Sequence, residues 1–310
     1  MFVRSILTTF ALLYAGLAFG AASFPTLTPQ PKLEKGAGAE LAATIQAGPN
    51  RLYFRELGAG RPVILLHGLG GDTTRWDQSM VPLAAAGYRA IALDMLGFGL
   101  SEKPSGPYRV ARLAQSLSAF LDALDLKDVV VVGNSLGGWT AAELALADPS
   151  RIAGLALVDA GYGYAAGTNP ATLSSRALPA SREDLGHLLQ LVFADHARFA
   201  SPDAVERAWV AAQAATNRHV IESLIASINR GEDVLDGRLG ALRVPTLVLS
   251  GRDDLLTPLA LSERMAAEIP GARLVAIDRC GHLPQVECPE PFNTALIAFL
   301  REVDLKGPSR

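Results

Sequence analysis

Residues 133–137, Gly-Asn-Ser-Leu-Gly, constrain the fold of this chain more than any other segment. The run before them, 129–132, consists of four valines and predicts a buried strand, whereas residues 138–145 have helical composition. A strand that turns sharply into a helix around G-x-S-x-G raises the serine hydroxyl above the sheet, and the glycines allow close backbone approach. Ser135 is therefore a candidate nucleophile, and the alternative is an ordinary Gly/Ser turn.

A serine nucleophile needs a base to take its proton and a third group to hold that base, and both follow Ser135 in the chain. The apolar run 245–250 predicts a strand, and the loop after it contains Asp253 and Asp254. The run 274–277 predicts the next strand, and the loop after it contains His282. Both loops follow the carboxyl ends of strands, where open α/β sheets bind ligands.

Four motifs in this order resemble those of the α/β-hydrolase fold family, and the resemblance covers most of the chain after about residue 40. They are His67-Gly68-Leu69-Gly70 after an apolar run, the turn Asp94-Met95-Leu96-Gly97-Phe98-Gly99-Leu100-Ser101, Gly251-Arg252-Asp253-Asp254 and Cys280-Gly281-His282. The resemblance implies a catalytic triad of Ser135, Asp254 and His282. It also implies an oxyanion hole formed by the backbone N–H groups of Leu69 and Leu136.

Several residues compete for these roles. Asp254 is favoured as the acid because, as in the family pattern, it stands four residues before a proline, but Asp253 and Asp159 stay open as alternatives. His67 precedes the serine, and its counterpart in the family supports the oxyanion loop. Asp94 is expected to shape its own Gly-rich turn. The other histidines are expected to be surface or packing residues: His187, His196 and His219.

Composition argues against other classes of chemistry. The 310 residues carry a net charge of −3 and no basic run, which argues against a nucleic-acid partner. The sequence lacks the zinc-protease, paired C-x-x-C and EF-hand patterns, so no metal site is predicted. No nucleotide-binding glycine motif follows a predicted strand, and the triad chemistry needs no cofactor. The expected partner is a small-molecule or lipid ester substrate.

The first 22 residues predict an export signal. A short basic start is followed by an uncharged, apolar run from Ser5 to Phe19 and then by small residues suited to cleavage. The alternative is an uncleaved anchor, which would be the source of any membrane association. In either case the catalytic domain is expected outside the cytoplasm, periplasmic or secreted. Only two cysteines occur, Cys280 and Cys288, and an exported protein could join them. Free thiols are expected, because Pro284 and Pro289 restrict the segment and Cys280 belongs to the loop that positions His282.

The rest of the chain is predicted to form one α/β domain with an insertion. Residues 23–40 are expected to be a linker, and 41–57 a strand hairpin turning at 48–50. Strands at 62–67, 88–93, 128–133 and 152–158 alternate with helices at about 76–86, 109–125 and 136–148, which predicts a mostly parallel sheet flanked by helices. The core is expected to comprise 41–160 and 239–310, with a helical cap at 161–238 containing helices at 182–195, 202–215 and 218–229.

The resemblance implies a serine hydrolase that acts through an acyl-enzyme intermediate, and the export signal favours carboxylic esters as its substrates, because products of aromatic ring fission are handled in the cytoplasm. Asn134, Arg207 and Trp209 are candidate substrate-binding residues, with cap packing or a solvated charge as the alternative for the two cap residues. The same motifs occur in relatives that cleave carbon–carbon bonds of vinylogous diketo acids, which often have Trp where this chain has Leu283. A small-molecule sensor with an intact triad is a further alternative.

Overall fold

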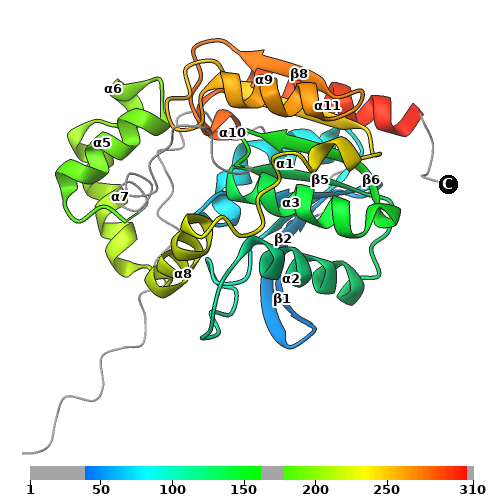
Figure 1. The fold of residues 1–310 in the computed structure, drawn as a ribbon, viewed down its shortest axis with the longest axis horizontal. Helices are drawn as coiled ribbons and strands as arrows, with labels where there is room; N and C mark the ends of the chain where they lie inside the picture. Colours follow the sequence, from blue (N-terminus) through cyan, green and yellow to red (C-terminus); the bar gives the residue numbers. More distant parts are fainter. Residues whose placement is uncertain (1–38, 162–177, 306–310) are drawn as a thin grey trace, which may run out of the picture.

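One twisted sheet of eight strands forms the centre of the computed structural model, which describes residues 39–161 and 178–305 (Figure 1). The strand order is β1-β2-β4-β3-β5-β6-β7-β8; β1 and β2 pair antiparallel with each other, β2 pairs antiparallel with β4, and the remaining neighbours are parallel. The strands are β1 Leu41–Ala47, β2 Asn50–Leu57, β3 Pro62–Leu66, β4 Arg89–Leu93, β5 Val129–Asn134, β6 Ile152–Val158, β7 Thr246–Gly251 and β8 Arg273–Ile277.

Helices cover both faces of this sheet, and two apolar clusters form the core. One cluster joins the sheet to α2, α3 and α9 through side chains such as Leu117, Phe120 and Met265. The other joins the opposite face to α1 and α11 through Leu83 and Phe292. The helices are α1 Asp77–Ala85, α2 Val110–Ala123, α3 Leu136–Ala147, α9 Leu259–Glu268, α10 Pro284–Glu287 and α11 Pro289–Leu305, with short 3₁₀ turns at Thr73–Trp76, Pro149–Arg151 and Leu239–Ala241. The predicted α/β class is confirmed.

Between β6 and β7 the described residues, 178 onward, form four further helices, which lie beside the sheet layers (Figure 1). They are α5 Arg182–Val192, α6 His196–Phe199, α7 Pro202–Ala214 and α8 Arg218–Asn229. The hydroxyls of Ser181 and Ser201 accept hydrogen bonds from backbone N–H groups in the first turns of α5 and α7, as their positions in the sequence indicate. Leu189, Phe193 and Phe199 form the centre of a small separate cluster in this insertion.

The predicted export signal and nearly all of the predicted linker lie outside the described residues. Among the described helices, none combines the length and the apolar character that a membrane span requires.

The prediction of free thiols is wrong, because Cys280 and Cys288 form a disulfide. Their Cα atoms are 6.2 Å apart, within the range that a disulfide spans. The two prolines do not keep the cysteines apart. Pro284 begins the single turn of α10 and Pro289 begins α11, so the chain after His282 folds back toward Cys280.

Cys288→Ser is expected to lower the free energy of unfolding by about 2–3 kcal/mol, because the disulfide closes a short loop and restricts the unfolded chain. Urea unfolding of the oxidised wild type and the variant measures this loss. Reduced wild type is the control, and its unfolding midpoint should move toward that of the variant. Equal midpoints for all three samples would contradict a stabilising disulfide.

Candidate active site

Ser135 lies on the sharp turn between β5 and α3, in a backbone conformation that L residues rarely adopt. Its φ is 54° and its ψ is −117°. The flanking glycines make this turn possible, because a Cβ on Gly133 would overlap the backbone of Gly137, and a Cβ on Gly137 would overlap the carbonyl of Leu66. The backbone N–H of Ser135 donates to Val158 O at 2.9 Å, which ties the turn to β6. The local sequence therefore forces the serine into this strained position above the sheet.

Asp254 and His282, which come from loops after β7 and β8, meet beneath the surface. The Nδ1 of His282 donates to Oδ2 of Asp254 at 2.7 Å, and the two residues are 4% and 2% exposed. This bond directs the other ring nitrogen, Nε2, away from the carboxylate. The structure thus brings together the base and the acid that the family resemblance indicates.

Asp253 and Asp254 differ in burial and in their hydrogen bonds. Asp253 is exposed, whereas Asp254 accepts two backbone N–H bonds on Oδ1 from Leu256 and Thr257, at 2.7 and 2.9 Å. Burial by itself would raise the pKa of Asp254. The charge of His282 and hydrogen bonds from His282 and Thr257 outweigh that effect and lower the pKa, so the carboxylate is ionised at neutral pH.

The loop after β3 packs directly against the nucleophile turn. A Cβ built on Gly68 would lie 3.1 Å from the Ser135 Cβ, so only a residue without a side chain fits comfortably there. Leu69 follows in this loop, half-buried, and Leu136 begins α3 and is buried. The first N–H groups of a helix have no acceptor within the helix, so the N–H of Leu136 has no partner in α3. Its place in an oxyanion hole stays a prediction.

His67 supports this loop and does not act as a base in this geometry. Its Nε2 accepts the backbone N–H of Met95 at 3.0 Å, so the ring proton is on Nδ1, which donates to Gly68 O at 2.7 Å. Burial lowers the pKa of His67 despite the neighbouring carboxylate of Asp94. Asp94 accepts backbone N–H bonds from Thr73 and Leu100 at 2.7 and 2.6 Å, which agrees with the expected role of shaping its turn.

Asn134 is fully buried and joins two loops. Its Nδ2 donates to His282 O at 2.9 Å and to Val158 O at 3.1 Å. Both N–H groups of the amide are therefore engaged within the protein, whereas its Oδ1 is buried without a hydrogen-bond partner among the described residues. The side chain holds the His282 loop against the nucleophile turn, and a substrate contact of Asn134 stays a prediction.

The two candidates in the insertion, Arg207 and Trp209, lie on α7. Arg207 is exposed, and Trp209 packs into the small cluster of the insertion with the Arg182 guanidinium 5.3 Å from its ring centre. These positions agree with the packing and solvated-charge alternatives for the pair. His187, His196 and His219 are all exposed, as expected from their surroundings.

Two positioning groups were not identified from the sequence. The hydroxyl of Thr257 donates to Oδ2 of Asp254 at 2.5 Å and lies 3.0 Å from Nδ1 of His282. The buried carboxylate of Glu287 accepts N–H bonds from Gly281 at 2.7 Å and Asp195 at 2.6 Å, and it thereby joins the His282 loop to the insertion. The only sequence signal for Glu287 is a lone acidic residue between apolar neighbours, which is weak evidence for such a role.

The His282 loop also contacts α5 directly. The backbone N–H of His282 donates to Val192 O at 2.6 Å, and a Cβ on Gly281 would overlap that carbonyl. The end of α5 therefore helps to set the position of the histidine.

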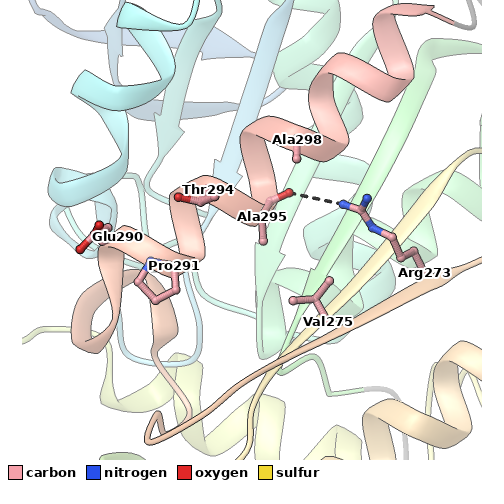
Figure 2. A pocket seen from close by; sticks show the side chains of 7 residues that line it. All are labelled: Arg273, Val275, Glu290, Pro291, Thr294, Ala295 and Ala298. Carbon is pink, nitrogen blue, oxygen red and sulfur yellow. Dashed lines mark hydrogen bonds between the residues drawn. The ribbon is translucent and has the colours of Figure 1, made fainter.

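Two other features of the described residues lie apart from this chemistry. Cys280, Glu287 and Cys288 are close enough together to share a metal ion, but the disulfide removes both thiolates as ligands. A groove between β8 and α11 is shown in Figure 2, where Arg273 donates to the carbonyl of Ala295 at 3.5 Å. Its lining contains none of the candidate site residues: Arg273, Val275, Glu290, Pro291, Thr294, Ala295 and Ala298.

Known proteins share this architecture. Residues 61–289 match the family model described as alpha/beta hydrolase fold. A 2-hydroxy-6-oxononadienedioate/2-hydroxy-6-oxononatrienedioate hydrolase of Paraburkholderia xenovorans is 33% identical over 267 residues, which cover 82% of this chain and 91% of that protein. A meta-cleavage product hydrolase from Pseudomonas fluorescens IP01 has a similar solved structure, with a TM-score of 0.73, 28% identity and coverage of 84% and 97% of the two chains.

A thermophilic esterase from Thermogutta terrifontis is equally similar in structure. Its TM-score is 0.72 at 28% identity, and the match covers 86% of this chain and 99% of the esterase. The family match extends from the strand before the oxyanion loop to the residues after the His282 loop, and so includes every motif on which the resemblance was based. The chain therefore belongs to the α/β-hydrolase fold family.

Proposed function

We propose that this chain is a serine hydrolase that cleaves the carbon–carbon bond of a vinylogous diketo acid, with Ser135 as nucleophile, His282 as base and Asp254 as its orienting acid. The observation that carries the catalytic part is the buried hydrogen bond of 2.7 Å between Asp254 and His282. Asn134, next to Ser135, holds the His282 loop by a hydrogen bond to the carbonyl oxygen of His282. The substrate class rests on the named activity of the Paraburkholderia relative. Carbon–carbon cleavage replaces ester hydrolysis, which the predicted export signal favoured, as the first candidate.

The proposed mechanism follows from where charge develops. His282 takes the Ser135 proton as the hydroxyl attacks the substrate carbonyl, and Asp254 stabilises the imidazolium that forms. The N–H groups of Leu69 and Leu136 stabilise the tetrahedral oxyanion. His282 then protonates the departing carbon, whose negative charge is spread over the conjugated acid. Water, activated by His282, releases the acyl group from Ser135 by the same steps.

Ester hydrolysis is the second candidate, and two observations favour it. A vinylogous diketo acid has a carboxylate that an arginine would hold, but Arg207, the candidate substrate-binding arginine, is exposed on α7. Leu283 stands where carbon–carbon hydrolases often have Trp, and its side chain packs with the cluster of the insertion. The two reactions share every step except the leaving group, which is an alkoxide in one and a stabilised carbanion in the other.

We further propose that the protein acts outside the cytoplasm. The support is the apolar N-terminal segment together with the Cys280–Cys288 disulfide, because disulfides persist in oxidising compartments. Fractionation of cells that produce the full chain, with a test for cleavage near residue 22, would check this proposal. Recovery of uncleaved, reduced protein from the cytoplasm would contradict it.

Turnover of two substrate types tests the proposed reaction. The mature protein would be assayed with a 2-hydroxy-6-oxo-dienoate, followed by its loss of absorbance, and with p-nitrophenyl esters of C2 to C16 acids. We expect kcat/KM to be highest for the dienoate, and we expect Ser135→Ala to abolish turnover of both.

The outcomes separate the candidates. Rapid turnover of esters with none of the dienoate would replace the first candidate by the second. Binding without turnover of either substrate by folded protein would contradict a hydrolase and favour a sensor. Unchanged turnover in Ser135→Ala would remove the serine from the mechanism.

A further inference from the structure

A second buried carboxylate, Asp159, lies directly behind the acid of the proposed triad. It follows β6, is fully buried and has a positive φ of 41°. Its Oδ1 accepts the Ser250 hydroxyl at 2.6 Å, and the N–H of Gly251 points between its two oxygens, at 3.2 and 3.1 Å. These bonds hold Asp159 against the end of β7, from which the loop with Asp254 begins.

The carboxyl groups of Asp159 and Asp254 are in contact. They lie within hydrogen-bonding reach of each other. Thr257 contacts both residues, because its hydroxyl donates to Oδ2 of Asp254 at 2.5 Å and lies 3.4 Å from the carbonyl oxygen of Asp159. Two ionised carboxylates that touch in a buried site repel strongly, so one of them retains a proton.

The hydrogen-bond donors around the pair determine which carboxyl group holds that proton. Asp254 receives four donors: the N–H groups of Leu256 and Thr257, the Thr257 hydroxyl and the His282 ring. Asp159 receives only the Ser250 hydroxyl and the Gly251 N–H from its protein neighbours among the described residues. Burial, and then the charge of Asp254, raise the pKa of Asp159 well above its usual range, whereas the pKa of Asp254 is lowered.

We propose that Asp159 is a positioning residue, a neutral carboxylic acid whose O–H donates to the Asp254 carboxylate and fixes the orientation in which Asp254 accepts the proton of His282. This role rests on the proposed function of the triad. It differs from that of a second acid, because Asp159 contributes a donor and no charge.

Two substitutions of Asp159 test whether the residue acts as a hydrogen-bond donor to Asp254 or as a negative charge. Asp159→Asn keeps the shape and an amide donor, and we expect kcat and the pH profile of p-nitrophenyl acetate hydrolysis to stay close to wild type. Asp159→Ala removes the donor, and we expect kcat to fall by about 10- to 100-fold with little change in KM. Thermal unfolding of both variants would establish that they are folded.

Infrared difference spectra test the same proposal without turnover. The spectrum of wild type minus Asp159→Asn at neutral pH should contain the C=O stretch of a protonated carboxylic acid. Ionised carboxylate bands in its place would overturn the proposal, as would an Asp159→Asn variant as inactive as Asp254→Asn. Wild type that hydrolyses no acyl substrate would contradict the proposed function, and the infrared result would still decide the state of Asp159.

Discussion

Asp254→Asn is expected to lower kcat by about 10⁴-fold with little change in KM, because the amide can donate to Nδ1 and so stabilise the wrong tautomer of His282. The charge that stabilises the imidazolium is lost as well. The buried amide would keep the shape of the side chain, so the fold should survive. Steady-state kinetics on whichever substrate the wild type prefers measures this effect.

Asp253→Asn is the matched control, since it makes the same change one residue earlier. Asp253 is exposed, and its backbone N–H, which donates to Cys280 O at 2.9 Å, is unchanged by the substitution. We expect near wild-type kcat for this variant. A large loss in Asp253→Asn with little loss in Asp254→Asn would reverse the assignment of the acid.

Gly133→Ala is expected to prevent folding or to lower the free energy of unfolding by more than about 4 kcal/mol. Its Cβ would overlap the carbonyl carbon of Gly137 and the nitrogen of Gly138, backbone atoms that cannot move without displacing α3. Because the overlap is with backbone, no change of side-chain rotamer can relieve it. Soluble yield and urea unfolding measure the effect.

Gly240→Ala tests whether the loss is specific to the close backbone approach. Gly240 lies in a short 3₁₀ turn, and a Cβ there would meet nothing closer than Glu268 O at 3.7 Å. The unfolding free energy of this variant should stay within about 1 kcal/mol of wild type. A Gly133→Ala protein of wild-type stability would show that the nucleophile turn can be rearranged.

The order of the elements could be predicted from the sequence because it depends on local pattern. The valine run before Gly133 becomes β5, and the predicted helices on either side of it differ from α2 and α3 by only a few terminal residues. The spacing of apolar residues and the residues that favour turns are properties of short segments. The order of strands and helices along the chain then limits how parallel strands can pair. The strained conformation of Ser135 is equally local, since it depends on the glycines beside it.

The disulfide is the clearest case in which the sequence led to the wrong result. The sequence shows how many residues, and of which kinds, separate Cys280 from Cys288. The distance in space between the two cysteines depends on the path of the chain through α10. Proline restricts the backbone without determining whether the two ends diverge or meet. Only the path of the folded chain could decide this question.

The sequence by itself determined the α/β architecture, the serine turn and the order of the polar loops, because these depend on local hydrophobic pattern and glycine sterics. The tertiary structure alone decided which of two adjacent aspartates meets His282, that Asn134 joins two loops, and that Asp159 touches Asp254. Each of these contacts links residues 24 or more positions apart in the chain. Local pattern contains no information on such distances, since they are set by how the strands pack side by side.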